Sequence, residues 1–207
     1  MKILVDNGHG ISTLGKRSPD GLFREYAYAR KVARELVARL KAQGYDAELL
    51  VPEDADIALG ERAKRVNAWC DRLGKESVLL VSIHNNAAGN GSQWLTATGW
   101  EAWTTKGQTQ GDKLADCLYD AAEEVLGGLL GNDLTPLKIR TDMTDGDRDK
   151  EENWTILYRS KCAAVLTENF FMDNRADVAW LNSDAGFDAI VRLHVEGIRK
   201  YVGKYGK

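Results

Sequence analysis

The segment Ser77–Ile83, with the sequence SVLLVSI, is the strongest strand signal in this chain of 207 residues. A short continuous apolar run is typical of a strand that is buried on both faces, as in a sheet covered by helices. The run stops at the polar residues His84, Asn85 and Asn86. In open α/β sheets, ligands bind in the crevice beyond the carboxyl ends of the strands. The segment therefore predicts a central strand and, at its end, the edge of a functional site.

Segments with strand and helix character alternate on both sides of this run, which favours an α/β sheet covered by helices. The other expected strands are Ile3–Val5, Ala47–Val51, Gly99–Thr105 and Ala163–Thr167. The expected helices are Glu25–Gln43, Leu59–Leu73, Asp112–Leu126 and Phe187–Tyr201. The segment Gly127–Asn153 is rich in Gly, Asp, Thr and Arg and is predicted to be a long loop, either mobile or serving a binding site.

The composition excludes several classes of function. The length suits one domain, and the formal charge of −3 gives no basic field that would favour nucleic acid or an anionic membrane as the main partner. Three scattered cysteines argue against a disulfide framework and against a Cys-based zinc site. No segment approaches the ~18 apolar residues of a membrane span, so we expect no integral membrane segment. The run Lys2–Val5 is too short for a signal peptide, so we expect synthesis in the cytoplasm without an export signal.

Side chains that bind metals occur where three of the predicted strands end. His9 follows the first strand and a turn-forming run, His84 follows the central strand, and Glu168 follows Ala163–Thr167. Each of these residues alone has an ordinary explanation, as a solvated loop residue or a hydrogen-bonded carboxylate. Their joint position at one edge of the sheet favours a metal site.

Glu25 adds a further carboxylate, on the apolar face of the helix that it begins. At about 100° per residue it shares this face with Ala29, Val32, Leu36 and Leu40. A carboxylate in such a place is costly unless it is paired, hydrogen-bonded or bound to a cation. The alternative is that Glu25 only complements the dipole at the start of the helix.

Zinc is the ion that this set of donors favours. Two imidazoles and one carboxylate are typical ligands of a catalytic zinc site, and a second carboxylate serves as the general base. Manganese, iron and cobalt are compatible with the same ligands. The third histidine, His194, lies within the last predicted helix and is interpreted as an ordinary helix residue. We therefore predict a metal-dependent hydrolase.

Five short motifs carry a family resemblance along nearly the whole chain. They are Asp6–Gly10 (DNGHG), Glu25 at a helix start, Leu59–Asn67 (LGERAKRVN), Ser82–Ala87 (SIHNNA), and Thr167–Phe171 (TENFF) followed by Asn174. In this order they resemble the zinc-dependent N-acetylmuramoyl-L-alanine amidases of the amidase-3 type, which cut peptidoglycan. The departures are local. Asn7 and Ile11 differ from the residues usual in the first loop, and Gly127–Asp149 has no clear counterpart.

The resemblance implies that His9, Glu25 and His84 bind one Zn²⁺ ion and that Glu168 is the catalytic acid–base. It also implies one catalytic domain over residues 1–207, with an open, twisted, mixed or parallel sheet of about six strands and helices on both faces. The expected substrate is peptidoglycan or a muramyl peptide, cut between the lactyl group of N-acetylmuramic acid and L-alanine. Some relatives carry an inserted helix that blocks the site, but no such pattern occurs here, so we expect an uninhibited enzyme, acting as a monomer.

Other polar residues are weaker candidates for substrate contact. They are Arg62 and Asn86 in the matching motifs and Arg140, Arg148 and Lys150 in the long loop, where a solvated charge cluster is the alternative. Trp100, Trp103 and Trp154 are either walls of the site or core residues, and Glu101 is a candidate supporting carboxylate.

Three functions and two biological settings are consistent with the sequence. The protein is either this amidase, another zinc peptidase or deacetylase acting on wall fragments, or a wall-binding module without activity. The presence of His9, Glu25, His84 and Glu168 together argues against the last. As an amidase it would act on the cell wall after release, like a prophage lysin, or on imported wall fragments.

Overall fold

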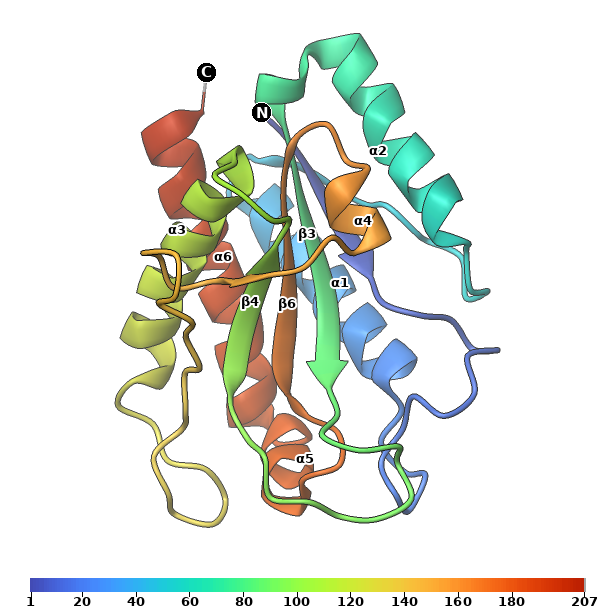
Figure 1. The fold of residues 1–207 in the computed structure, drawn as a ribbon, viewed down its shortest axis with the longest axis vertical. Helices are drawn as coiled ribbons and strands as arrows, with labels where there is room; N and C mark the ends of the chain where they lie inside the picture. Colours follow the sequence, from blue (N-terminus) through green and yellow to red (C-terminus); the bar gives the residue numbers. More distant parts are fainter. Residues whose placement is uncertain (207) are drawn as a thin grey trace.

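Six strands form one open, twisted sheet within residues 1–206, the part of the chain that the computed structural model describes (Figure 1). In chain order the strands are β1 (Lys2–Asn7), β2 (Asp46–Leu49), β3 (Val78–Asn86), β4 (Trp100–Thr104), β5 (Lys150–Glu151) and β6 (Ala163–Phe171). Their order across the sheet is β2-β1-β3-β6-β4-β5. Neighbouring strands are parallel except β4 and β6, which are antiparallel. The predicted class, a mixed open α/β sheet, is therefore confirmed.

Helices cover both faces of the sheet, as expected. One face carries α1 (Glu25–Ala42), α3 (Gln110–Leu126) and α6 (Asp184–Tyr205), and the other carries α2 (Leu59–Leu73) and α4 (Thr155–Tyr158). A short 3-10 helix, η1 (Lys75–Ser77), precedes β3, and α5 (Arg175–Leu181) follows β6. In Figure 1, α2 and α4 lie in front of the upper part of the sheet, and the lower ends of β3 and β6 extend below them. The carboxyl ends of these two strands are therefore not covered by α2 and α4.

The alternation of side chains along β3 explains its continuous apolar run. Leu79, Val81 and Ile83 belong to the core beneath α1, α3 and α6. Val78 and Leu80 point the other way, into the smaller core beneath α2 and α4. Because both faces of the strand are buried, apolar residues are favoured at successive positions.

The central strands continue further than the apolar pattern predicted. β3 runs to Asn86 and β6 to Phe171, so His84 and Glu168 lie inside strands. The prediction that each residue follows the end of a strand was wrong, because backbone pairing continues where the apolar run stops. The pairing shifts register after His84 and Glu168, at a bulge where Phe170 has a φ of 62°.

The four long helices are close to their predicted ranges, whereas α4 and α5 are too short to give a periodic pattern and were not predicted. The segment Gly127–Asn153 is mostly irregular, as predicted, but it contains β5 and a bridge between Ile139 and Trp100. Within residues 1–206, no helix is both long enough and apolar enough to cross a membrane.

Two glycines of α6 allow a matched test of the packing between α3 and α6. A Cβ atom at Gly197 would lie 2.6 Å from Leu118 Cδ2 and 2.9 Å from its Cα, whereas one at Gly203 would meet nothing within 4 Å. We expect Gly197→Ala to lower the free energy of unfolding by about 1–3 kcal/mol through overpacking. Gly203→Ala should raise it by at most about 1 kcal/mol through helix propensity. Urea denaturation measures both, and equal shifts would contradict the close packing.

Candidate metal centre and active site

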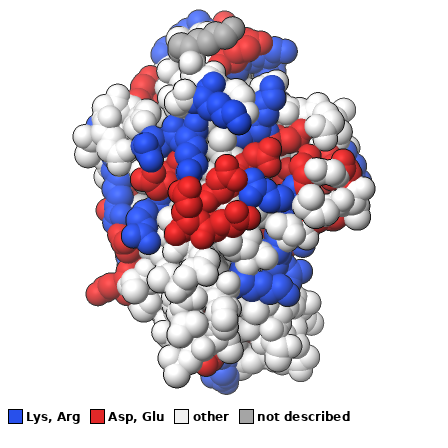
Figure 2. Space-filling model, turned by 90° about the vertical axis from the view of Figure 1, so that its left-hand side faces the viewer, with Lys and Arg blue, Asp and Glu red and all other residues white. Residues whose placement is uncertain are grey.

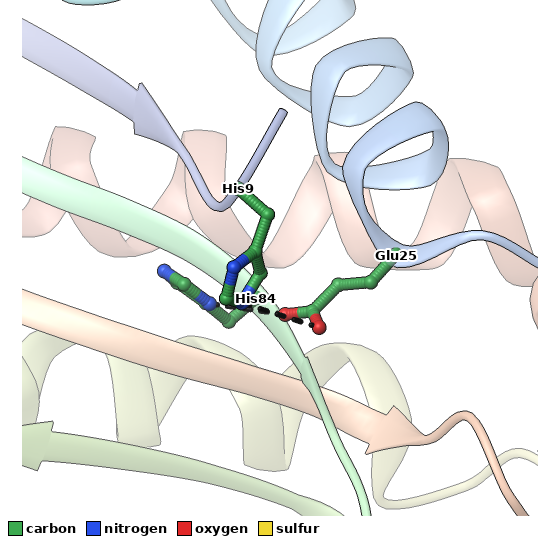
Figure 3. A group of neighbouring side chains, drawn as sticks. All are labelled: His9, Glu25 and His84. Atoms are coloured by element: carbon green, nitrogen blue, oxygen red, sulfur yellow. Dashed lines mark hydrogen bonds and ion pairs between the residues drawn. The ribbon is translucent and has the colours of Figure 1, made fainter. Parts of the chain in front are cut away.

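Three side chains from distant parts of the chain converge at the carboxyl end of the sheet (Figure 3). His9 comes from the loop after β1, Glu25 from the first turn of α1, and His84 from β3. Glu25 Oε1 lies 3.0 Å from His84 Nδ1, and Glu25 Oε2 lies 3.4 Å from His9 Nε2. One ligand atom from each residue lies within 4.8 Å of the others. This geometry allows all three residues to bind a single metal ion.

The donors themselves fit a divalent cation. Glu25 is 1% exposed, and its Oε2 atom has no hydrogen-bond partner among residues 1–206. The rings of His9 and His84 lie edge to face with centroids 5.1 Å apart. A buried carboxylate oxygen without a partner, beside two imidazole nitrogens, is the donor set that zinc prefers in catalytic sites.

The charges at this site are consistent with metal binding. Burial lowers the pKa of His9 to about 4, although the Glu25 charge opposes the shift. Burial alone would raise the pKa of Glu25, but the hydrogen bond from His84 and the two imidazoles bring it below its ordinary value. Burial lowers the pKa of His84, but the Glu25 hydrogen bond and charge outweigh it and raise the pKa. His9 is therefore neutral and Glu25 ionised near pH 7, the forms that bind a cation, whereas His84, whose pKa is raised, must release any proton on the ring nitrogen that binds the cation.

Buried arginines hold the loop that carries His9. The backbone of His9 has a φ of 60°, which is uncommon outside glycine. Its carbonyl oxygen accepts hydrogen bonds from Arg30 Nη1 at 3.0 Å and from Arg62 Nη2 at 3.2 Å. Arg62 also donates to Asp6 Oδ1 at 2.8 Å and to the carbonyl of Asn7 at 2.7 Å. These contacts stabilise a strained conformation that orients the imidazole.

Arg62 was a candidate for substrate contact, but it is 1% exposed and its hydrogen bonds go to the first loop and its neighbours. We therefore give it a role in positioning His9 rather than in binding substrate. Sequence reasoning missed Arg30, which is 4% exposed and contacts the same carbonyl. The available signal was its place beside the apolar face of α1, where a charged residue needs a partner.

Glu168 lies beside the metal-binding group. In the sheet it pairs with His84 of β3 on one side and with Glu101 of β4 on the other. Its Oε2 atom is buried and makes no hydrogen bond within residues 1–206. Burial raises the pKa of Glu168 to about 8; His84 opposes this shift, whereas Glu25 and Glu101 add to it. At this pKa the carboxyl group is mostly protonated near pH 7, and a cation held by the neighbouring residues would favour its ionised form, which can accept a proton.

Three of the remaining candidate residues donate hydrogen bonds to the side chain of Glu101. The carboxylate is 1% exposed and accepts hydrogen bonds from Asn86 Nδ2 at 2.9 Å, Arg140 Nε at 2.6 Å and Lys150 Nζ at 2.8 Å. Trp103 Nε1 donates a fourth at 2.9 Å. Asn86, Arg140 and Lys150 therefore contact a carboxylate that lies one strand away from Glu168.

Arg148 and His194 lie outside this group. Arg148 is bound to Asp116, Asp120 and Glu123 on α3, so we do not extend the prediction of substrate contact to it. Figure 2 shows the side of the molecule that includes α3, where acidic and basic side chains are interspersed. His194 is buried in α6 and contacts Thr167 Oγ1 at 2.9 Å. It is not part of the metal-binding group.

Comparison with known proteins identifies the family. A family model described as N-acetylmuramoyl-L-alanine amidase matches residues 3–200. The chain belongs to this amidase family. It is 26% identical to the endolysin of Bacillus phage SPP1 over 95% of this chain and 64% of the endolysin. It is 28% identical to the amidase CwlM of Bacillus licheniformis over 97% of this chain and 68% of CwlM. The chain thus spans about two thirds of these relatives.

Solved structures of amidases share the fold of this family member. An N-acetylmuramoyl-L-alanine amidase from Clostridium difficile 630 superposes with a TM-score of 0.77 and 24% identity, over 99% of this chain and 98% of that one. The catalytic domain of the CD27L endolysin targeting Clostridia difficile superposes with a TM-score of 0.68 and 25% identity, over 97% of each chain. The fold observed here is therefore the fold of these amidase structures.

Gly8 provides a test of the metal centre in this amidase. A Cβ atom at position 8 would lie 2.4 Å from the His84 ring, whereas one at Gly128 would meet nothing within 4 Å. We expect Gly8→Ala to displace the imidazole and to weaken the affinity of the candidate site for a divalent cation about 10–100-fold, with that of Gly128→Ala unchanged. Competition with a chelator measures the affinity, and circular dichroism checks the fold. Unchanged affinity in Gly8→Ala would contradict the proposed ligand set.

Proposed function

We propose that this protein is a zinc-dependent N-acetylmuramoyl-L-alanine amidase. It hydrolyses the amide between the lactyl group of N-acetylmuramic acid and the L-alanine of the peptidoglycan stem peptide. The observation that carries the proposal is the convergence of His9, Glu25 and His84, with Glu168 on the adjacent strand, in a chain that belongs to the family.

In the proposed mechanism, His9, Glu25 and His84 hold one zinc ion. When bound there, zinc supplies Lewis acidity, which polarises the scissile carbonyl and lowers the pKa of water. The carboxylate of Glu168 accepts a proton from the attacking water as the new carbon–oxygen bond forms. It then returns this proton to the leaving nitrogen as the amide bond breaks, so that a lactyl carboxylate and a free L-alanine amine are produced. The buried Oε2 atom of Glu168, which has no hydrogen-bond partner within residues 1–206, supports this role.

We further propose that residues 1–207 act as one catalytic domain and bind a single zinc ion, and that the protein is a monomer. The substrate belongs to the bacterial cell wall. An endolysin and a protein named probable cell wall amidase LytH of Staphylococcus epidermidis are both among the relatives, which supports this assignment. Release as a lysin and action on imported fragments are both compatible with the chemistry of the site.

Product analysis separates this proposal from the alternative of a peptidase or deacetylase. Digestion of purified peptidoglycan should release new L-alanine amino termini while leaving muramic acid N-acetylated. Amino-terminal labelling and mass spectrometry identify these products. Cleavage within the peptide, or loss of acetyl groups, would instead indicate the alternative enzyme, and absence of any cleavage would favour a binding module.

Substitution of Glu168 tests the acid–base role. We expect Glu168→Gln to lower kcat about 10²–10⁴-fold, because proton transfer is lost. Its zinc content, measured by elemental analysis, should stay at one ion per chain, since Glu168 is not among the three ligands. Glu76→Gln, on the exposed surface of η1 at the other end of β3, is the matched control and should keep full activity. Normal turnover by Glu168→Gln would remove this residue from the mechanism.

A further inference from the structure

A line of three side chains crosses the sheet at the level of the metal-binding group. His84 of β3 pairs with Glu168 of β6, and Glu168 pairs with Glu101 of β4. Beyond Glu101, the long loop supplies Arg140 and Lys150, which both bind Glu101 Oε2. Two cations on one carboxylate leave a surplus of one positive charge next to the catalytic glutamate.

The backbone fixes Arg140 firmly in this position. Its N–H donates to the carbonyl of Trp100 at 2.8 Å, and its own carbonyl accepts from Tyr119 Oη at 2.9 Å. Gly99, with a φ of 124°, allows the side chain to lie against β4, since a Cβ atom there would be 2.8 Å from Arg140 Cγ. The residue is therefore held in place before any ligand binds.

Both cations keep donors for a further partner. The Arg140 side chain is 30% exposed, and its hydrogen bonds within residues 1–206 go from Nε to Glu101 and from Nη1 to the carbonyl of Thr98. The Lys150 side chain is 18% exposed, and its ammonium, which has three protons, donates one hydrogen bond, to Glu101, within the same residues. Nη2 of Arg140 and two protons of Lys150 thus stay available for an anion.

We propose that Arg140 and Lys150, organised by Glu101, form a subsite for a carboxylate on the peptide part of the substrate. This inference rests on the proposed amidase function. Neighbouring strands lie about 4.8 Å apart, so Glu101 lies about 5 Å from Glu168 across the sheet, and the cations that contact its carboxylate lie roughly 5–8 Å from Glu168. That distance corresponds to about two residues of extended peptide. The subsite therefore takes a carboxylate on the second or third residue after the scissile amide, and the peptide runs over β4 towards the long loop.

The test uses matched pairs of synthetic muramoyl tripeptides, which carry either a carboxylate or a carboxamide on the second or the third residue. The wild-type, zinc-loaded enzyme should cleave the acid form of at least one pair with a kcat/KM about 10-fold higher, the value of one charge-assisted hydrogen bond. Arg140→Gln and Lys150→Gln should each reduce this preference, mainly by raising KM for the acid form. The preference should also decrease as the salt concentration increases.

Arg148→Gln is the matched control, because Arg148 lies in the same loop but is bound to acidic residues of α3. It should keep the wild-type preference. Equal cleavage of acid and amide forms by the wild type, or an unchanged preference in both Arg140→Gln and Lys150→Gln, would overturn the subsite while leaving the amidase function intact. If the wild type cleaves none of these tripeptides and releases no L-alanine termini from peptidoglycan, the proposed function itself fails, and the subsite with it.

Discussion

The buried carboxylate of Glu25 is the group on which the site depends. An ionised carboxylate that is removed from water is strongly destabilising unless charged partners and hydrogen bonds surround it. Here Glu25 Oε1 lies 3.0 Å from His84 Nδ1 and accepts a hydrogen bond from the backbone N–H of Asn85 at 3.1 Å. The other oxygen, Oε2, faces His9 Nε2. Glu25 also begins α1, where the helix dipole favours a negative charge. The same interaction therefore positions α1 against β3 and brings the candidate metal ligands together.

A second layer of buried charge supports the first. Arg62 and Asp6 form an ion pair in which both side chains are 2% exposed, and Ser82 donates to the same carboxylate at 2.5 Å. Such a pair is retained when its geometry satisfies both charges, and breaking it leaves an unpaired buried ion. Here the ion pair helps to position His9, since Arg62 and Arg30 both donate hydrogen bonds to the carbonyl of His9. The local strain at His9 is thus supported by contacts from α1 and α2.

The sheet distributes the remaining charges by strand. β3 carries His84, β6 carries Glu168, and β4 carries Glu101 with its two cations, all at one level. In the roles that we propose, this arrangement places metal binding, proton transfer and recognition of the peptide on three neighbouring strands. It depends on β4 lying next to β6 although the two strands are separated by about 60 residues in the chain, many of which belong to the long loop whose cations then reach Glu101.

The sequence by itself determined the α/β class and singled out His9, Glu25 and His84, which the fold brings together. Buried strands and amphipathic helices have local periodicities, and Glu25 stood out as a charge on an apolar face. Only the tertiary structure decided the rest. The pairing of β6 with β4 placed Glu101 beside Glu168. Arg62 is buried, and Arg148 forms ion pairs with acidic residues of α3. These outcomes depend on contacts between segments distant in the chain. Local sequence patterns do not predict these contacts, because the partner of a charged side chain depends on which groups the fold brings near it.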